Sequence, residues 1–362
     1  MELAIAKSQG ARGDGSPGSQ GDGSPRKKEV PVYYTSLLVS VTESCTVGCR
    51  HCGYLGSTRS KEATEDQIAD WVTQALDYGI PNIIFTGGEP FQRFRLLKAG
   101  VRAAHEHESH PGISSFTSSF WGKSPEAVDQ ILDQLSGLDH LYLSTDVFHQ
   151  ERVPPAYVMN VIDSAIRRGF NHITLCVTIA EDAEEEQFRT LYQGYGDRLM
   201  FHIDRVIPSQ FTKTSHPQRQ LKPIAANFSA DCYLKTPIIN PDGDIAACHI
   251  AKVGAHQSLD DEVYFLGNLH REPFSDIMKR SEGNYQYQFL RAFGPQGVAR
   301  LVQQSDSLRT HFGERTFTRD CDLCCRVLLN KKGKEALREW TDDSFNRELI
   351  DSVLTTRLGE DR

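Results

Sequence analysis

The sequence predicts an α/β protein with a parallel β-sheet, and the order of its apolar segments is the main reason. From about residue 33, short apolar runs that suit buried strands alternate with runs of helical apolar spacing. Six strand–helix units fit into about 175 residues, which favours a parallel sheet with its functional site at the carboxyl ends of the strands. The 362 residues can bury a full core and form two domains. This pattern alone does not separate a partial barrel from a doubly wound sheet.

The first two units carry the clearest local signals. Leu37–Val41 is an apolar strand, and the run from Thr64 to Gln67 has the capping-box pattern that begins a helix. Gly79 is expected to end that helix, and Ile83–Phe85 is the next strand. The later predicted strands are Ile113–Thr117, Leu141–Ser144, Ile173–Ile179 and Leu199–Ile207, with helices at 126–136, 156–168 and 184–194.

Composition and charge disfavour several classes of protein. The net charge of −8 argues against nucleic acid as a partner. No apolar run reaches the roughly eighteen residues of a membrane span, and the N-terminus lacks the apolar core of a signal peptide. We therefore expect a cytoplasmic protein with no membrane partner, in which nine cysteines indicate metal ligation and not disulfides. Residues 1–30 are rich in Gly, Ser, Asp and Pro, and are predicted to be a disordered tail.

Three closely spaced cysteines give the strongest chemical signal. Cys45, Cys49 and Cys52 follow the first predicted strand in a C-x3-C-x2-C pattern. Three thiolates on a short loop can hold one face of a [4Fe–4S] cluster and leave the fourth iron without a protein ligand. An iron with a vacant position can bind and activate a substrate or a cofactor.

A second motif follows the second predicted strand. Gly87, Gly88 and Glu89 stand before Pro90, directly after the apolar run that ends at Phe85. Glycines allow a ligand to approach the backbone closely, and a carboxylate can accept hydrogen bonds from an ammonium group. Alone, this run could also be a simple turn.

Together the two motifs resemble those of the radical S-adenosylmethionine (radical SAM) enzymes. The resemblance implies a partial (β/α)6 barrel, a [4Fe–4S] cluster on Cys45, Cys49 and Cys52, and a SAM site that includes Gly87, Gly88 and Glu89. It also implies reductive cleavage of SAM to a 5′-deoxyadenosyl radical, which needs an electron donor such as flavodoxin or ferredoxin. The family usually has an aromatic residue before the third cysteine, where this chain has His51, whose imidazole can stack in a similar way.

Other candidate site residues lie at predicted strand ends. Ser119, Ser144 and Arg205 are expected to contribute to the cofactor site, and Asp146 is a candidate catalytic residue with His149 nearby. The alternative for each is an ordinary cap or loop residue. Cys176 lies within an apolar strand, where it is either a core residue or, facing the barrel interior, a hydrogen-atom donor.

A second group of cysteines lies in the C-terminal half. Cys232 and Cys248 flank a Pro-Asp-Gly hairpin signal, and Cys321 and Cys324 follow in a C-x2-C pattern with Cys325 adjacent. The arrangement resembles the twitch domain, a shortened SPASM domain that holds one auxiliary [4Fe–4S] cluster. The resemblance implies the ligands Cys232, Cys248, Cys321 and Cys324, with Cys325 as a possible substitute for Cys324. The same four ligands would also suit zinc.

The expected organisation has four parts: a tail at 1–30, the barrel at 31–225, the auxiliary domain at 226–332 and a helical tail at 333–362. The expected function is a radical SAM oxidoreductase-type enzyme of natural-product biosynthesis that oxidises a small polar molecule such as an aminocyclitol or a sugar. The first alternative is modification of a ribosomally made peptide by cross-linking, epimerisation or oxidation. The second is a non-catalytic iron–sulfur or zinc scaffold.

Overall fold

The fold is taken from a computed structural model, which describes residues 34–52, 62–206, 221–232, 236–248 and 263–360. The predicted tail at 1–30 and Ile207 lie outside these residues. Contacts between Cα atoms group Val32–Arg362 into one compact unit. Strands and helices alternate through its first half in the predicted order.

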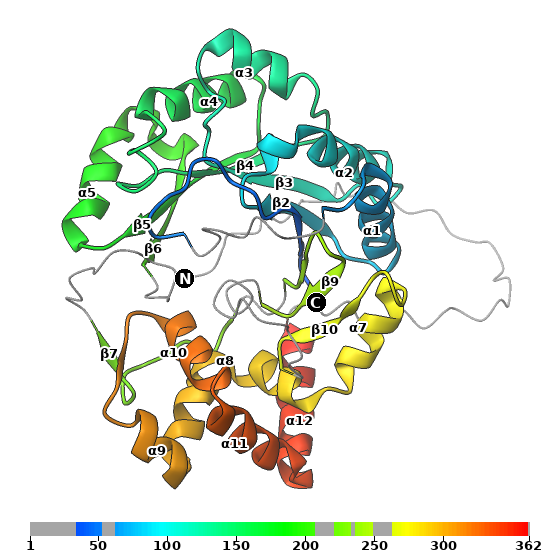
Figure 1. Cartoon of the computed structure of the whole chain (residues 1–362), viewed down its shortest axis with the longest axis vertical. Helices are drawn as coiled ribbons and strands as arrows, with labels where there is room; N and C mark the ends of the chain where they lie inside the picture. Colours follow the sequence, from blue (N-terminus) through cyan, green and yellow to red (C-terminus); the bar gives the residue numbers. More distant parts are fainter. Residues whose placement is uncertain (1–33, 53–61, 207–220, 233–235, 249–262, 361–362) are drawn as a thin grey trace, which may run out of the picture. The chain divides into compact units, whose positions relative to one another are not determined.

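Six parallel strands in chain order form the main part of the sheet (Figure 1). They are β1 (Leu37–Thr42), β2 (Asn82–Gly87), β3 (Gly112–Thr117), β4 (His140–Ser144), β5 (His172–Ile179) and β6 (Met200–Arg205). The helices between them are α1 (Glu65–Asp77), α2 (Phe94–Glu106), α3 (Pro125–Leu132), α4 (Pro155–Arg167) and α5 (Asp182–Leu191), with short 3-10 helices η1 (Pro90–Arg93) and η2 (Gln193–Arg198). The predicted open (β/α)6 arrangement is confirmed, with element ends that differ from prediction by a few residues.

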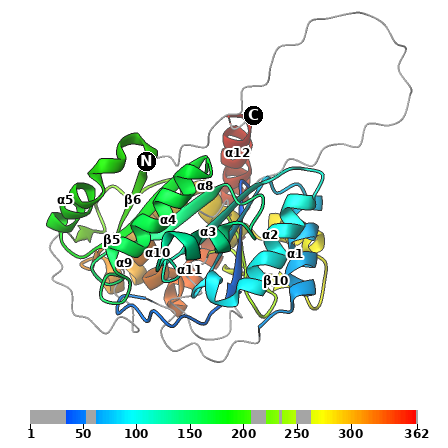
Figure 2. The same ribbon diagram turned by 90° about the horizontal axis from the view of Figure 1, so that it is seen from above.

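The core lies between this sheet and the helices that follow its strands (Figure 1). Alternate strand residues such as Val39, Phe85, Leu143 and Leu175 are fully buried, because neighbouring side chains of a strand point to opposite faces. Helices α1 and α2 lie side by side, as do α3 and α4 (Figure 2). The other sheet face is therefore left for the C-terminal half and for ligands.

The first helix forms as its sequence predicts. The side chain of Thr64 accepts a hydrogen bond from the Gln67 backbone N–H at 3.2 Å, and the Gln67 side chain accepts one from the Thr64 N–H at 2.9 Å. Gly79 follows the helix with a φ of +101°, a conformation that favours glycine. Between them, Ile68, Trp71 and other apolar residues of one helix face are buried.

The C-terminal half extends the same sheet. Strand β9 (Asp244–Ala246) pairs antiparallel with both β8 (Ile238–Ile239) and β10 (Phe265–Asn268), and β8 pairs in parallel with β1. The predicted hairpin is confirmed: the turn between β8 and β9 closes through the Asn240 N–H and the Asp244 carbonyl at 2.8 Å, and Gly243 has a φ of +81°. The region that carries the second group of cysteines is thus joined to the barrel by strand pairing.

Helices make up most of the remaining chain. They are α7 (Phe274–Glu282), α8 (Tyr285–Gln304), α9 (Asp306–Phe312), α10 (Asp320–Leu328), α11 (Lys331–Asp342) and α12 (Ser344–Glu360), and a small antiparallel pair is formed by β7 (Lys222–Pro223) and β11 (Thr316–Phe317). Helices α9, α10, α11 and α12 all neighbour α8 or one another. The predicted helical tail corresponds to α11 and α12.

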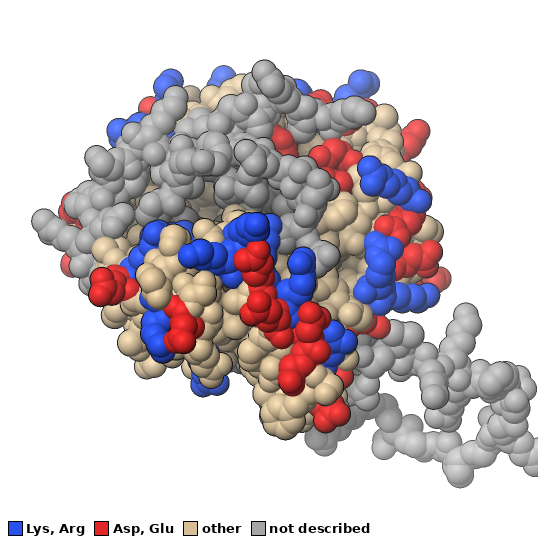
Figure 3. Space-filling model, turned by 60° about the horizontal axis from the view of Figure 1, so that its bottom comes forward, with Lys and Arg blue, Asp and Glu red and all other residues tan. Residues whose placement is uncertain are grey.

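The surface of the described residues carries charges of both signs. Figure 3 shows Lys and Arg side chains interleaved with Asp and Glu side chains on one face, without a large field of a single sign. None of the described helices is long and apolar enough to cross a membrane.

Candidate functional site

The cysteine loop begins where β1 ends. Cys49 is buried, Cys45 and Cys52 are half-buried, and none of the three is in a disulfide. The loop turns at Gly48, which has a φ of +67°, and the Cys52 N–H donates to the Cys49 carbonyl at 3.1 Å. Burial raises the pKa of the Cys45 thiol, although the N–H groups of Gly48 and Val47 hydrogen-bond to its sulfur and favour the thiolate. Such N–H donors suit a thiolate that ligates a metal.

The Gly-Gly-Glu-Pro segment is attached to this loop through the backbone. The Gly88 N–H donates to the Thr42 carbonyl at 2.7 Å, and the Glu89 N–H donates to the Ser44 carbonyl at 3.0 Å. A Cβ atom at Gly88 would lie 2.3 Å from the Ser44 carbonyl oxygen, so only glycine fits here. The two motifs that the sequence singles out therefore meet in space.

The side chain of Glu89 points into the protein. Its carboxylate accepts hydrogen bonds from the Thr117 hydroxyl at 2.9 Å, the Ser118 N–H at 2.7 Å, the Ser118 hydroxyl at 2.5 Å and the Phe91 N–H at 3.2 Å. Burial raises the pKa of Glu89, while these donors act in the opposite direction. Four donors use the lone-pair sites that a carboxylate offers, so this side chain joins β2 to the end of β3.

Ser119 is strained and has an unused hydroxyl. It is a fully buried non-glycine residue with a φ of +63°, and its Oγ has no hydrogen-bond partner among the described residues. Backbone strain of this kind is often found at ligand sites, and a buried hydroxyl without a partner is costly. A polar ligand beside the cysteine loop would satisfy it, which fits SAM.

Asp146 and His149 form a buried ion pair beside the cysteine loop. The Asp146 carboxylate accepts from the His149 Nδ1 at 2.8 Å and from the N–H groups of Phe148, His149 and Thr178. Burial lowers the pKa of His149, but Asp146 and Cys49 outweigh it and raise that pKa well above its usual value. The ring centre of His51 lies 5.2 Å from that of His149 and 4.6 Å from that of Phe148. The His51 ring is tilted by 38° against Phe148 and lies edge-on to His149.

Cys176 and Ser144 lie on the sheet face that the helices leave open. Register pairs Ser144 with Cys176 and Cys176 with His202, whereas the adjacent Leu143 and Leu175 face the helices. Burial, with Asp204 and Asp146 nearby, raises the pKa of the Cys176 thiol, so it is a neutral S–H at ordinary pH. This placement corresponds to the interior-facing alternative for Cys176.

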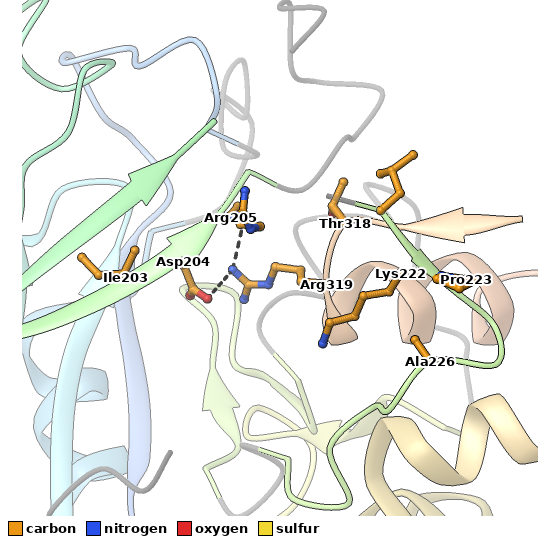
Figure 4. Close-up of a pocket in the computed structure, with 9 residues that line it drawn as sticks. Ile203, Asp204, Arg205, Lys222, Pro223, Ala226, Thr318 and Arg319 are labelled. Atoms are coloured by element: carbon orange, nitrogen blue, oxygen red, sulfur yellow. Dashed lines mark hydrogen bonds and ion pairs between the residues drawn. The ribbon is translucent and has the colours of Figure 1, made fainter. Parts of the chain in front are cut away.

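Arg205 and its neighbours line a cavity at the end of β6. The Arg205 side chain pairs with Asp182 of α5, on the opposite strand face from Asp204. The cavity has a volume of about 590 Å³ and is drawn in Figure 4. Its walls are Ile203, Asp204, Arg205, Leu221, Lys222, Pro223, Ala226, Thr318 and Arg319.

The second group of cysteines also comes together. Cys232 precedes the β8–β9 hairpin, Cys248 follows it, and the three remaining cysteines lie in α10. Burial raises the pKa of the Cys324 thiol, and nearby Cys232, Cys321, Cys325 and Cys248 raise it further. The pKa of Cys325 is raised in the same way by burial and by Cys248 and Cys321. Several thiols packed in one buried place suit a metal centre better than they suit an apolar core.

Tyr264 gives an independent test of that fit. Its side chain is fully buried and its hydroxyl has no hydrogen-bond partner among the described residues. Burial raises the pKa of Tyr264, and Cys324, Cys325, Cys248 and Cys232 raise it further, so the phenol lies among these sulfurs. A neutral phenol O–H at this position can donate a hydrogen bond to a negatively charged thiolate that ligates a metal.

Sequence reasoning missed several of these contacts. Thr117 holds Glu89, Tyr264 lies among the C-terminal thiols, and Arg319 reaches from that region to β6. Arg319 stands two residues before Cys321, so its position next to a predicted ligand was the available signal. Thr117 and Tyr264 carry no local signal that separates them from ordinary strand or core residues.

Comparison with known proteins agrees with this geometry. Residues 39–192 match the radical SAM superfamily, and the matched segment spans β1 to the end of α5, including the cysteine loop and the Gly-Gly-Glu-Pro segment. Residues 39–192 therefore match a radical SAM domain, which is typical of a superfamily of enzymes. This match supports a [4Fe–4S] cluster and SAM as cofactors.

Individual relatives are more distant. A probable GTP 3′,8-cyclase of Methanosarcina acetivorans is 23% identical over 189 residues, 47% of this chain and 54% of that protein. The GTP 3′,8-cyclase of Listeria welshimeri is 28% identical over 121 residues, 32% of this chain and 34% of that protein. The chain thus matches about half or less of their length.

One solved structure resembles nearly the whole chain. It is described as native anSMEcpe with bound AdoMet and a Cp18Cys peptide, with a TM-score of 0.51 and 12% identity. The similarity covers 89% of this chain and 99% of that one. At this identity it shows a shared fold.

Proposed function

We propose that Cys45, Cys49 and Cys52 hold the [4Fe–4S] cluster of this radical SAM enzyme, with SAM bound by the adjacent Gly-Gly-Glu-Pro segment. The backbone hydrogen bonds that attach Gly88 and Glu89 to the start of the cysteine loop carry this proposal. Because the Glu89 carboxylate already has four protein donors, the Gly87–Glu89 backbone is the part of the motif that would contact SAM. The hydroxyl of Ser119 and the nearby end of β4 at Ser144 would complete the cofactor site.

When bound, the cluster and SAM supply a 5′-deoxyadenosyl radical that takes a hydrogen atom from an unactivated C–H bond of the substrate. The protein's residues position the parts. Asp146 fixes the His149 ring beside Cys49 and so acts as a positioning residue, because its own oxygens are all used by protein donors. Cys176 faces the open side of the sheet as a neutral thiol, which keeps a role as hydrogen-atom donor open to test.

We further propose an auxiliary [4Fe–4S] cluster on Cys232, Cys248, Cys321 and Cys324, with residues 226–332 as its domain. The thiol group, the unpartnered Tyr264 hydroxyl and the position of Cys321 and Cys324 on one face of α10 support it. Cys325, one residue further, is the alternative to Cys324. A substrate that has lost a hydrogen atom would then release a proton to solvent and one electron to this cluster, a two-electron oxidation overall.

The substrate we propose is a small polar molecule such as an aminocyclitol or a sugar. The cavity at β6 is within the range of about 300–1,000 Å³ that is common for small ligands, and both acidic and basic groups line it. The unpartnered Thr318 hydroxyl in its wall suits a ligand with hydroxyl or amino groups. A ribosomally made peptide is the alternative substrate. GTP is included in the test because the sequence relatives are named GTP 3′,8-cyclases.

The activity test is reductive cleavage under anaerobic conditions. Reconstituted protein with SAM and dithionite should release 5′-deoxyadenosine, and a variant with Cys45, Cys49 and Cys52 all changed to Ala should release none. Equal release by both proteins contradicts the proposed cluster. Mass analysis of aminocyclitols, sugars, candidate precursor peptides and GTP then identifies the substrate class, and a change in peptide alone would overturn the small-molecule proposal.

Metal analysis tests the auxiliary cluster separately. The full protein should contain about eight iron and eight sulfide per chain, and the triple cysteine variant about four of each. About one zinc per chain in that variant, with no iron, would assign the second thiol group to zinc.

A further inference from the structure

Among the described residues, Arg319 is the one that both contacts a cysteine of the second thiol group and lines the β6 cavity. It lies between β11 and α10, and its Nη2 donates to the Cys321 sulfur at 3.5 Å. On its other side, Nη1 pairs with Asp204 Oδ1 at 2.9 Å and donates to the Arg205 carbonyl at 3.3 Å (Figure 4). The guanidinium therefore connects a predicted cluster ligand to the carboxyl end of β6.

The charge on Arg319 is held in place on both sides. Its side chain is 19% exposed, and burial works against its charge, but Cys321 and Asp204 raise the pKa of Arg319. Asp204 has a second partner, since His202 Nε2 lies 3.1 Å from its other oxygen. The guanidinium therefore stays positive at every ordinary pH and cannot easily swing away from the sulfur.

We propose that Arg319 is a positioning residue that raises the reduction potential of the auxiliary cluster, with Asp204 moderating its effect. The inference rests on the proposed function, because it needs a cluster on Cys321. Reduction by one electron adds a negative charge to a cluster and its thiolates. A hydrogen bond to a ligand sulfur from a buried cation stabilises that added charge, and hydrogen bonds to sulfur are among the main determinants of such potentials. The gain is greatest at low exposure, where water screens the charge least.

The position of Arg319 also relates the raised potential of the auxiliary cluster to the proposed substrate site. The same guanidinium lines the cavity where the proposed substrate would bind. The residue that raises the reduction potential of the auxiliary cluster therefore lies next to the proposed electron source. A higher potential makes the auxiliary cluster a better acceptor for a substrate-derived electron. Lys222 lines the cavity too, but it pairs with Asp320 at 2.8 Å and has no described contact with a cysteine.

The test is redox potentiometry of the full chain in the Cys45/Cys49/Cys52→Ala background, where the auxiliary cluster alone contributes a signal. Arg319→Gln should lower the midpoint potential by about 59 mV. For a one-electron couple, this shift is a tenfold change in the ratio of oxidised to reduced cluster at a fixed potential. Asp204→Asn should shift the potential upward, because it leaves the guanidinium charge less neutralised. Lys222→Gln, a matched loss of a cavity cation, should leave the potential unchanged.

Opposite shifts at Arg319 and Asp204 are not expected from a purely structural contact, because both variants break the same ion pair. If the background protein holds a cluster and all variants share its potential, the role of Arg319 is wrong while the auxiliary cluster stands. If the background protein with native Arg319 holds no cluster, the auxiliary cluster itself is wrong. Iron content and thermal midpoint are measured for each variant, and Arg319→Lys, which keeps the charge, should recover part of the shift if Arg319→Gln folds poorly.

Discussion

At the scale of single residues, Glu89 shows how a motif side chain can be used inside the protein. The sequence singles out Glu89 as part of a conspicuous motif, but it does not predict the direction of its carboxylate, which depends on Thr117 and Ser118 about 28 residues away. The Asp146 carboxylate likewise accepts four hydrogen bonds from protein donors. A motif predicts where a site lies, whereas the use of each polar atom depends on partners from other strands.

Gly88 offers a sharp residue-level test of the site. In Gly88→Ala the new Cβ would lie 2.3 Å from the Ser44 carbonyl oxygen and 2.6 Å from that of Glu43, so the backbone before Cys45 must move. We expect a loss of about 1–3 kcal/mol of stability and of most SAM affinity, measured by thermal unfolding and equilibrium dialysis.

The matched control is Gly194→Ala. No atom lies within 4 Å of a Cβ at Gly194, so stability should change by less than about 0.5 kcal/mol and SAM affinity should stay the same. If the two variants behave alike, the close approach of the two motifs does not matter for SAM binding.

At the scale of elements, local sequence signals were sufficient where the interactions are themselves local. The capping box at Thr64, the glycine after α1 and the turn at Gly243 each involve residues within a few positions of one another, and each is confirmed. The ends of α3 and β6 were less accurate, because an element stops where its tertiary contacts stop. The predicted end of the sixth strand at Ile207 lies beyond the described residues.

The capping box of α1 gives an element-level prediction. Thr64→Ala removes the side-chain acceptor of the Gln67 N–H and should destabilise the protein by about 1 kcal/mol, measured by chemical denaturation. Thr73→Ala is the control in the same helix. The Thr73 hydroxyl only bonds back to the Ala69 carbonyl at 3.0 Å, so its loss should be nearly neutral. Equal losses in both variants would mean that the cap contributes nothing specific.

At the scale of the whole molecule, one sheet connects the two cysteine groups. The parallel pairing of β8 with β1 joins residues about 200 positions apart, with Leu38 opposite Ile238 and Val39 opposite Ile239. The sequence predicted both strands but not their pairing, because two-residue β8 has no pattern that selects a partner. The predicted boundary between two domains at residue 225 therefore stays a prediction. The sheet itself is continuous across the two parts.

Global stability should depend on pH through His140 at the start of β4. Burial, together with the neighbouring His172, lowers the pKa of His140 to about 4, and its Nε2 lies 2.9 Å from the Thr174 hydroxyl. An unfolded histidine titrates near 6.5, so between about pH 6.5 and 4 the unfolded chain binds a proton that the folded chain does not. Its contribution is fully present above pH 6.5 and is lost as the pH falls towards 4, by at most about 3 kcal/mol.

The comparison with His140→Gln isolates this contribution from the other titrating groups. Glutamine can still hydrogen-bond to Thr174 but does not titrate, so the variant should lose some stability at pH 7 and show a flatter profile below pH 6.5. The stability of the native protein minus that of the variant should therefore fall steadily from pH 6.5 to pH 4. The buried pair of Asp146 and His149 is present in both proteins and cancels in this difference. A difference that stays constant across that range would mean that His140 is protonated as readily in the folded protein as in the unfolded chain.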